Sequence, residues 1–191
     1  MLTLNLQKTN FLMKKLILST ATLLTLVAVF AFAPAATNWQ IASKYNIRFT
    51  GGGDVGGIFK TFKGSIAFDE QNPGASNFAL VVEVASVNTG NALMNNHIKS
   101  AEWLDATKFP QIKFTSKKIE KAGAAYQVTG DLEIHGVTKE VKLPFSFVAK
   151  GAAATFNGTF TVSRNDFHIG KPGGDVDENI KLEISVPVTK K

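Results

Sequence analysis

The chain has 191 residues, of which 45% are hydrophobic and 10% aromatic, and it contains 15 phenylalanines and no cysteine. This composition suits a folded domain with a sizeable core, and it excludes a disordered tail, a collagen-like fibre and a disulfide-stapled mini-protein. The lack of cysteine also excludes thiol catalysis, thiolate zinc sites and lipid attachment through an N-terminal cysteine.

Residues 1–36 have the pattern of a secretory signal peptide. Two lysines precede an uncharged run from Leu16 to Phe32, and small residues follow it, as at a signal-peptidase site. We expect cleavage after Ala35 or Ala36, and Met13 is an alternative start of the chain. A retained membrane anchor is the alternative reading, although the run is close to the lower length limit for a span and no basic cluster follows it.

Removal of residues 1–36 takes away three lysines and no acid, which leaves 18 basic and 15 acidic residues and a net charge of +3. Such a mild excess, without a block of Lys or Arg, is not the footprint of a nucleic-acid-binding protein, so no nucleic-acid partner is expected. We expect a periplasmic or secreted protein with one domain over residues 37–191. An oxidising compartment permits disulfides without requiring them.

Period-two alternation of apolar and polar residues predicts eight β-strands in this domain. The exception is one helix, predicted from Ala92 to Leu104, with capping residues at Asn88–Asn91 before it and Pro110 after it. The predicted strands cover residues 41–49, 58–68, 78–87, 112–119, 126–134, 140–148, 155–163 and 180–188.

Eight antiparallel strands joined mostly in sequence predict an all-β protein, an up-and-down barrel large enough to hold one ligand inside. A β-sandwich has a similar number of strands and is the alternative. The many phenylalanines favour the barrel, because they exceed what the packing of one small sandwich requires.

Alternation also indicates which side chains share a face, although it does not decide which face points inward. We expect the face with the larger apolar residues to line the interior and to bind an apolar ligand. The alternative without a ligand is that the same residues fill a solid core and leave no cavity. The predicted residues are Ile47, Phe49, Ile58, Phe62, Ile66, Phe68, Leu80, Val82, Phe114, Leu132, Phe145, Phe147, Phe156 and Phe160.

The three histidines differ in their expected roles. His97 lies on the predicted helix and is a candidate to hydrogen-bond the head group of a ligand at the mouth of the barrel, or else to bond the barrel backbone. His135 begins a His-Gly turn and His168 lies in a long loop, so both are expected to be structural. Nothing in their spacing favours a metal site.

No catalytic residue, metal or cofactor is expected. A nucleophile such as Ser86, Ser100 or Ser116 would need a histidine base and an orienting acid, and no G-x-S-x-G segment is present. The acidic cluster within 175–179 is at most a loose calcium site, because it lacks the full EF-hand spacing.

Several segments, taken together and in order, resemble the YceI-like family. The resemblance covers nearly the whole chain after residue 36, and it is specific as a set. Its segments are W-x-I from Trp39, G-x-F-x-x-F-x-G-x-I-x-F-D (Gly57–Asp69), S-V-N-T-G-N (Ser86–Asn91), H-I-K-S (His97–Ser100), W-L-D-A (Trp103–Ala106), F-P-Q-I-K-F (Phe109–Phe114) and V-x-G-x-L-x-I-H-G-V-T-K (Val128–Lys139).

The resemblance implies an eight-stranded, lipocalin-like antiparallel barrel with the helix at one region of it. It also implies a periplasmic or secreted carrier that holds a polyisoprenoid lipid, such as a polyprenyl chain or an isoprenoid quinone, in its pore. The implied partners are this hydrophobic lipid, a membrane contacted transiently, and a second copy of the chain in a homodimer.

One departure from the family pattern bears on the ligand. Where many members carry an Asp and a His-Ser pair in the first strand, this chain has Ala42, Tyr45 and Asn46. A head-group role for that His-Ser pair therefore does not carry over. The alternative functions are a stress-associated scaffold barrel without lipid and a secreted hydrolase that uses His97.

Overall fold

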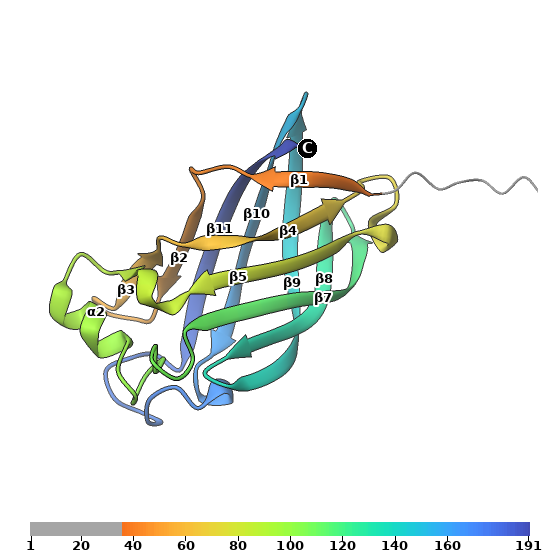
Figure 1. Ribbon diagram of the computed structural model, residues 1–191. Helices are drawn as coiled ribbons and strands as arrows, with labels where there is room; N and C mark the ends of the chain where they lie inside the picture. Colours follow the sequence, from red (N-terminus) through yellow and green to blue (C-terminus); the bar gives the residue numbers. More distant parts are fainter. Residues whose placement is uncertain (1–35) are drawn as a thin grey trace, which may run out of the picture. The chain divides into compact units, whose positions relative to one another are not determined.

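A computed structural model describes residues 36–191 of the protein (Figure 1). The segment expected to be a signal peptide lies outside these residues, apart from Ala36. The described chain forms one antiparallel sheet that closes on itself. Its five long strands, which all come from the second half of the chain, are β7 (Gln111–Ala122), β8 (Ala125–Ile134), β9 (Val137–Lys150), β10 (Ala153–Ser163) and β11 (Asn179–Lys190).

The first three predicted strands are each broken into two shorter ones. The halves of the first strand both pair with β11, at its C-terminal and N-terminal parts respectively, and the halves of the second and third strands follow the same division. These halves are β1 (Thr37–Ile41) and β2 (Asn46–Thr50), β3 (Gly56–Phe59) and β4 (Phe62–Phe68), and β5 (Asn77–Glu83) and β6 (Val87–Asn88).

The barrel therefore has eight strand positions, three of them occupied by a pair of short strands. Neighbours around the ring follow the chain order, from β1 with β4 through β5, β7, β8, β9 and β10 to β11, which pairs with β1 again. The eight-stranded barrel predicted from the sequence is confirmed, and the sandwich alternative is wrong.

The break between β3 and β4 changes which side chains point inward. Lys60 and Thr61 stand outside both strands, and the Tyr45 hydroxyl replaces the ladder there: it donates to the Lys60 carbonyl at 2.7 Å and accepts from the Phe62 N–H at 3.0 Å. The Ser86 hydroxyl accepts from the Thr61 N–H at 3.0 Å. Two residues instead of one separate Phe59 from Phe62, so the alternation of inward and outward side chains shifts by one position, as it does at a β-bulge.

The helix α2 (Ala92–Ile98) begins as predicted, because the Asn91 side chain accepts hydrogen bonds from the N–H groups of Leu93 and Met94. It ends six residues earlier than predicted. Residues at positions 98, 103 and 104 all reach the interior, which a straight helix with 100° per residue does not allow. Within residues 36–191, no helix has the length and apolar character needed to cross a membrane.

One end of the barrel is filled by packed aromatic rings. Phe68, which is 1% exposed, lies at its centre, and the Trp39 indole N–H donates to the Phe68 carbonyl at 3.2 Å. Because the rings meet mostly edge to face, they fill the space and gain favourable aromatic contacts. The rings within 4.8–6.2 Å of Phe68, measured between centroids, are Phe78, Tyr126, Phe145, Phe147 and Phe156.

At the opposite end, Arg164 organises the loop that joins β10 to β11. It is only 3% exposed, and it forms no ion pair with a carboxylate anywhere in the described part of the chain. Its five N–H groups are instead directed at oxygens of the loop, which compensates the loss of hydration of the buried charge. The acceptors are the Asn165 side chain and the carbonyls of Ile169, Lys171, Gly173, Val176 and Asp177, at 2.7–3.3 Å.

We predict that Phe68→Ala lowers the free energy of unfolding by about 3–5 kcal/mol, because it leaves a void among rings that cannot collapse into it. Urea denaturation followed by circular dichroism measures this change. Val148→Ala is the control: Val148 is 60% exposed, so its truncation should change stability by less than about 0.5 kcal/mol. Equal effects of the two substitutions would contradict the filled end.

We predict that Arg164→Lys lowers the free energy of unfolding by about 2–4 kcal/mol, because an ammonium group with three donors cannot replace five guanidinium N–H groups. Arg48→Lys is the matched control, since Arg48 is exposed on β2, and it should change stability by less than about 0.5 kcal/mol. A similar small effect at Arg164 would show that the loop does not depend on the guanidinium.

Candidate ligand-binding site

Between the aromatic end and the loop held by Arg164, the barrel interior contains a cavity of about 270 Å³. An engineered apolar cavity of about 150 Å³ stays dry and binds benzene, so this cavity is large enough for an apolar ligand. Its lining is apolar except for three residues with polar side chains, Lys113, Asn157 and Arg164, and the Trp103 indole N–H.

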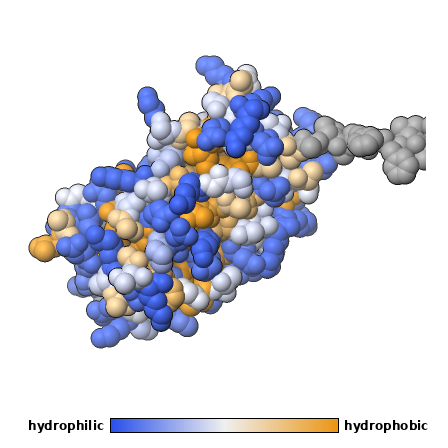
Figure 2. All heavy atoms as spheres, in the orientation of Figure 1, coloured by the Kyte–Doolittle hydropathy of each residue, from blue (hydrophilic) through white to orange (hydrophobic). Residues whose placement is uncertain are grey.

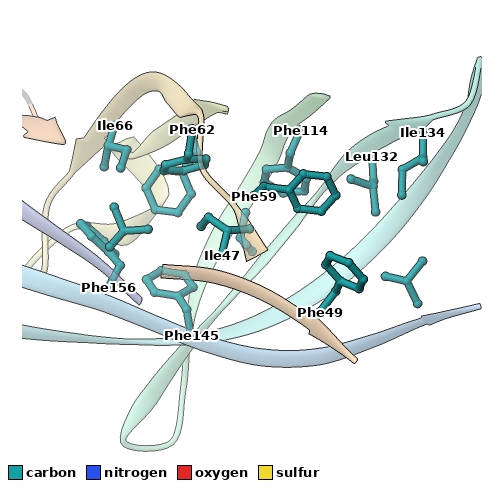
Figure 3. Close-up of a cluster of buried hydrophobic side chains, with 14 of the residues drawn as sticks. Ile47, Phe49, Phe59, Phe62, Ile66, Phe114, Leu132, Ile134, Phe145 and Phe156 are labelled. Atoms are coloured by element: carbon teal, nitrogen blue, oxygen red, sulfur yellow. The ribbon is translucent and has the colours of Figure 1, made fainter. Parts of the chain in front are cut away.

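Eleven of the fifteen residues predicted to bind a ligand line this cavity. They come from strands all around the barrel, and Figure 3 shows many of these side chains directed toward the same interior. Alternation along the strands accounts for them, because successive inward positions on a strand are two residues apart. The eleven are Ile47, Phe49, Phe62, Ile66, Leu80, Val82, Phe114, Leu132, Phe145, Phe156 and Phe160.

Ile58 does not line the cavity, and the expectation that it points inward is wrong. In the β2–β3 ladder Ile58 lies opposite Arg48, which is exposed, so both occupy the outer face. The buried neighbour Phe59 takes the inward position instead. The reason is the break at residues 60–61, which shifts the phase of alternation between β3 and β4.

The other three predicted residues lie away from the cavity for different reasons. Phe68 and Phe147 belong to the aromatic end, where their ring centroids are 4.8 Å apart. His97 lies on the exposed side of α2 and contacts the cavity only through Trp103, whose ring centroid is 5.2 Å from its own. The expected direct contact of His97 with a head group in the cavity is therefore not what the geometry provides.

Sequence reasoning missed lining residues of two kinds. Most of those on the strands follow the same alternation as the predicted ones and were identifiable from it. They include Ile180, Leu182, Ile184 and Val186 on β11 and, on other strands, Phe78, Ile112, Val128, Ile134, Leu143 and Val162. Those near the loop end follow no period, so no local signal identified them. The second kind comprises Val55, Ile98, Trp103, Leu104, Arg164, Ile169 and Val176.

The hydrogen-bonded ladder between β9 and β10 is incomplete. These strands pair only from Ser146–Lys150 to Ala153–Asn157, although β9 stays paired with β8 and β10 with β11 well beyond that point. Pro144, which has no N–H to donate, stands where the ladder stops. Pro144 and Asn157, on the two sides of the gap, both line the cavity. We call this gap the β9–β10 slot.

The far end of the slot is closed by contacts between the β8–β9 turn and the loop before β11. Lys139 Nζ lies 2.7 Å from Asp166 Oδ1, and His135 Nδ1 lies 3.3 Å from the Phe167 carbonyl oxygen. His135 and Gly136 have positive φ angles, so the predicted His-Gly turn is present. These contacts tie the start of β9 and the turn before it to the loop that follows β10.

At the loop end, Trp103 and Arg164 are the lining residues that carry polar groups. Trp103 lines the cavity, and its Nε1 is the only buried side-chain nitrogen or oxygen without a hydrogen-bond partner among residues 36–191. The Arg164 guanidinium carbon lies 5.8 Å from the centroid of the Trp103 ring. An unpaired indole N–H is unusual in a buried position, because it loses its hydrogen bond to water.

Two of the three serines considered for catalysis, Ser86 and Ser116, have structural partners. The Ser86 hydroxyl bonds the backbone at Thr61 and Glu83, and the Ser116 hydroxyl accepts from the Phe78 N–H. No group of three or more His, Cys, Asp or Glu residues in the described chain is close enough together to hold a metal ion.

The two carboxyl groups whose pKa is shifted also lie outside the cavity. A hydrogen bond from Lys63 is the main cause that lowers the pKa of Glu83, and one from Lys181 lowers the pKa of Glu183. Both carboxyl groups form ion pairs on the outer face of the barrel. Figure 2 shows one side of the molecule, where hydrophilic residues cover much of the surface with hydrophobic atoms visible between them. The cavity itself is suited to holding an apolar molecule.

Solved structures share this fold. The crystal structure of BcnA from Burkholderia cenocepacia superposes with a TM-score of 0.75 at 26% identity, covering 78% of this chain and all (100%) of that one. A polyisoprenoid binding domain from Saccharophagus degradans superposes with a TM-score of 0.59 and covers 82% of this chain and 99% of its own. At 11% identity, this second likeness concerns the fold alone.

Comparison of sequences identifies the family as well as the fold. A UPF0312 protein of Pectobacterium carotovorum is 34% identical over 182 residues, which cover 86% of this chain and 95% of that protein. The family model of the YceI-like domain matches residues 31–188. The chain therefore belongs to the YceI-like family.

Proposed function

We propose that the protein is a carrier that binds a hydrophobic lipid of the isoprenoid type in the barrel cavity. The observation that carries this proposal is the apolar cavity of about 270 Å³ between the two closed ends. The polyisoprenoid binding domain with the same fold supports the ligand class. The scaffold alternative expects a solid core, and the cavity argues against it.

The energetics favour exchange over permanent capture. Transfer of a lipid tail from water into an apolar cavity is favourable by about 0.8 kcal/mol per methylene. A membrane offers the tail an equally dry environment, so transfer between membrane and cavity is close to neutral for the tail. Selection must then come from the shape of the cavity and from polar groups that meet the head.

The β9–β10 slot gives a long chain a route out of the cavity. Apolar residues that line the cavity lie on both strands beside it, Leu143 and Phe145 on β9 and Phe160 on β10. A polyprenyl chain longer than the cavity can leave through the slot without breaking the barrel ladders. Transient contact of this side with a membrane, and a homodimer that covers it, both stay predictions of the carrier model.

We predict that the full chain, expressed with its N-terminal segment and purified without detergent, retains an isoprenoid lipid in native mass spectrometry. Ile184→Trp should lower lipid affinity at least about tenfold, because the larger ring fills the cavity that Ile184 lines. Ile58→Trp is the matched control on the outer face and should retain the lipid. A wild-type protein that stays free of lipid after incubation with squalene and a short-chain ubiquinone would falsify the carrier function.

The proposed site of action is the periplasm or the extracellular medium, and it rests on the signal-like pattern of residues 1–36. We predict that cell fractionation recovers the protein in the soluble periplasmic or secreted fraction. N-terminal sequencing should then begin at Ala36 or Thr37. Recovery in the membrane pellet with an intact N-terminus would instead support the anchor alternative.

A further inference from the structure

We propose that residues 91–109 form a hinged lid over the cavity, and that a hydrophobic ligand enters and leaves when this lid moves away from the barrel. The lid consists of α2 and the chain that follows it up to Phe109. This inference rests on the proposed function and adds the route and the moving part by which the cavity is loaded.

The first argument is a break in the barrel wall beside α2. The ladder between β5 and β7 ends at Glu83 and Gln111, and one further hydrogen bond follows it, from the N–H of residue 84 to the carbonyl of residue 110 at 2.9 Å. Beyond that point β6 pairs with β3, and no ladder joins β6 to β7 in the described chain. The lid spans this stretch, at the end of the barrel where β7 begins (Figure 1). The wall is made there by side chains and not by paired strands.

The lid closes the cavity with apolar side chains. Ile98, Trp103 and Leu104 line the cavity, and Ile98 and Leu104 are 8% and 9% exposed. The buried Trp103 Nε1 forms no hydrogen bond with any part of residues 36–191, so it does not fix the lid to the barrel. Apolar contacts are non-directional, and a passing apolar ligand can therefore replace them.

Few polar contacts join the lid to the rest of the barrel. Within residues 36–191, one backbone hydrogen bond does so, from the Gly170 N–H to the Glu102 carbonyl at 2.9 Å. The ion pair between Lys171 and Glu102 is long at 3.8 Å, and its side chains are 88% and 54% exposed, so it contributes little. By comparison, β10 pairs with β11 along its whole length. Opening at the lid therefore breaks far fewer hydrogen bonds than opening between those strands.

The lid has internal hydrogen bonds that let it move as one piece. The Asn91 side chain caps the start of α2. Beyond the helix, the Leu104 N–H donates to the Ile98 carbonyl at 3.0 Å. The Phe109 N–H donates to the Asp105 carbonyl at 2.7 Å. All of these bonds stay intact when the segment turns about its ends.

The two ends of the lid have the character of hinges. Gly90 precedes it with a φ angle of 81°, a conformation that glycine adopts without strain, and no atom lies within 4 Å of the place where a Cβ would stand. Pro110 follows it, and its carbonyl is held by the Val84 N–H. The Thr89 N–H and hydroxyl contact the Asn95 side-chain oxygen at 2.8 and 2.9 Å, which sets the closed position. Rotation at Gly90 moves the lid while Pro110 stays anchored.

The lid closes against the β10–β11 loop, which the Arg164 guanidinium holds in place. The same loop contacts the β9–β10 slot, the other interrupted part of the wall, through Lys139 and Asp166. One ion pair thus marks each route, Lys171 with Glu102 at the lid and Lys139 with Asp166 at the slot. The slot accommodates a tail longer than the cavity, whereas the ligand itself passes the lid.

Cross-linking tests the lid directly, because the chain has no cysteine of its own. In the full chain, Glu102→Cys and Lys171→Cys are combined and joined by a short bis-maleimide. Binding of N-phenyl-1-naphthylamine, which fluoresces more strongly in apolar surroundings, is then followed by stopped flow. The cross-link should lower the association and dissociation rate constants each at least about tenfold and change Kd less than about twofold, because it blocks passage and leaves the cavity unchanged.

The matched control joins Lys139→Cys to Asp166→Cys at the slot with the same reagent, and it should leave both rate constants unchanged. Single-cysteine variants treated with the reagent control for modification alone. Unchanged rates with the lid cross-linked, or slowing by the slot cross-link only, would overturn the inference while the carrier function stands. A changed Kd with an unchanged association rate would also overturn it, because the segment would then be part of the lining only.

The variant Leu104→Ala weakens the apolar closure and should raise the dissociation rate constant of the same probe at least about threefold. Leu93→Ala is the matched control on the same segment, since Leu93 is 81% exposed and does not line the cavity. Circular dichroism checks the folding of both variants, and equal rates in the two would count against the lid. Failure of both the probe and squalene to bind the wild-type protein would instead overturn the proposed function, and the lid with it.

Discussion

The constraint on which the rest of this structure depends is the interior of an eight-stranded barrel, which must be filled by side chains or by a ligand. The chain meets it in two ways. Around Phe68 the interior is filled by aromatic rings in mutual contact, and beyond them it is left as an apolar cavity of about 270 Å³. Because the wall of the cavity is apolar, binding of an apolar ligand there is favourable.

Closure of the barrel and access to its interior make opposite demands on the backbone. A complete ladder satisfies every N–H and carbonyl group but seals the cavity. In this chain one ladder ends early at Pro144, and Lys139 on β9 forms an ion pair with Asp166 in the loop after β10. At the break between β3 and β4 the ladder is also interrupted, but the Tyr45 hydroxyl replaces it and keeps the backbone groups hydrogen-bonded. In this chain Tyr45 therefore supports the wall of the barrel.

The sequence predicted the eight strand positions because alternation is a local property that each strand shows by itself. It predicted the cavity lining wherever a strand runs without interruption, as at Phe114, Leu132 and Phe156. It failed at Ile58, because the break at residues 60–61 shifts the alternation by one position. That break depends on hydrogen bonds of the Tyr45 side chain, which is distant in the sequence. The polar groups at the loop end were not predictable at all: Arg164 reads as an ordinary residue after a strand, and only the folded loop shows that its donors converge on carbonyls.

In the carrier model, the polar groups that meet the head of the lipid decide which kind of lipid the cavity favours. A membrane and the cavity are equally dry, so the tail contributes little to the direction of transfer, and one hydrogen bond of about 1 kcal/mol is then a large share of the remaining difference. A carrier benefits from a difference of this size, because a head group held by many charged donors would be released slowly. The Arg164 guanidinium holds its own loop, so its buried charge serves stability and its N–H groups are not available to the head of a lipid. Selectivity for the head and reversibility of binding therefore have the same physical origin.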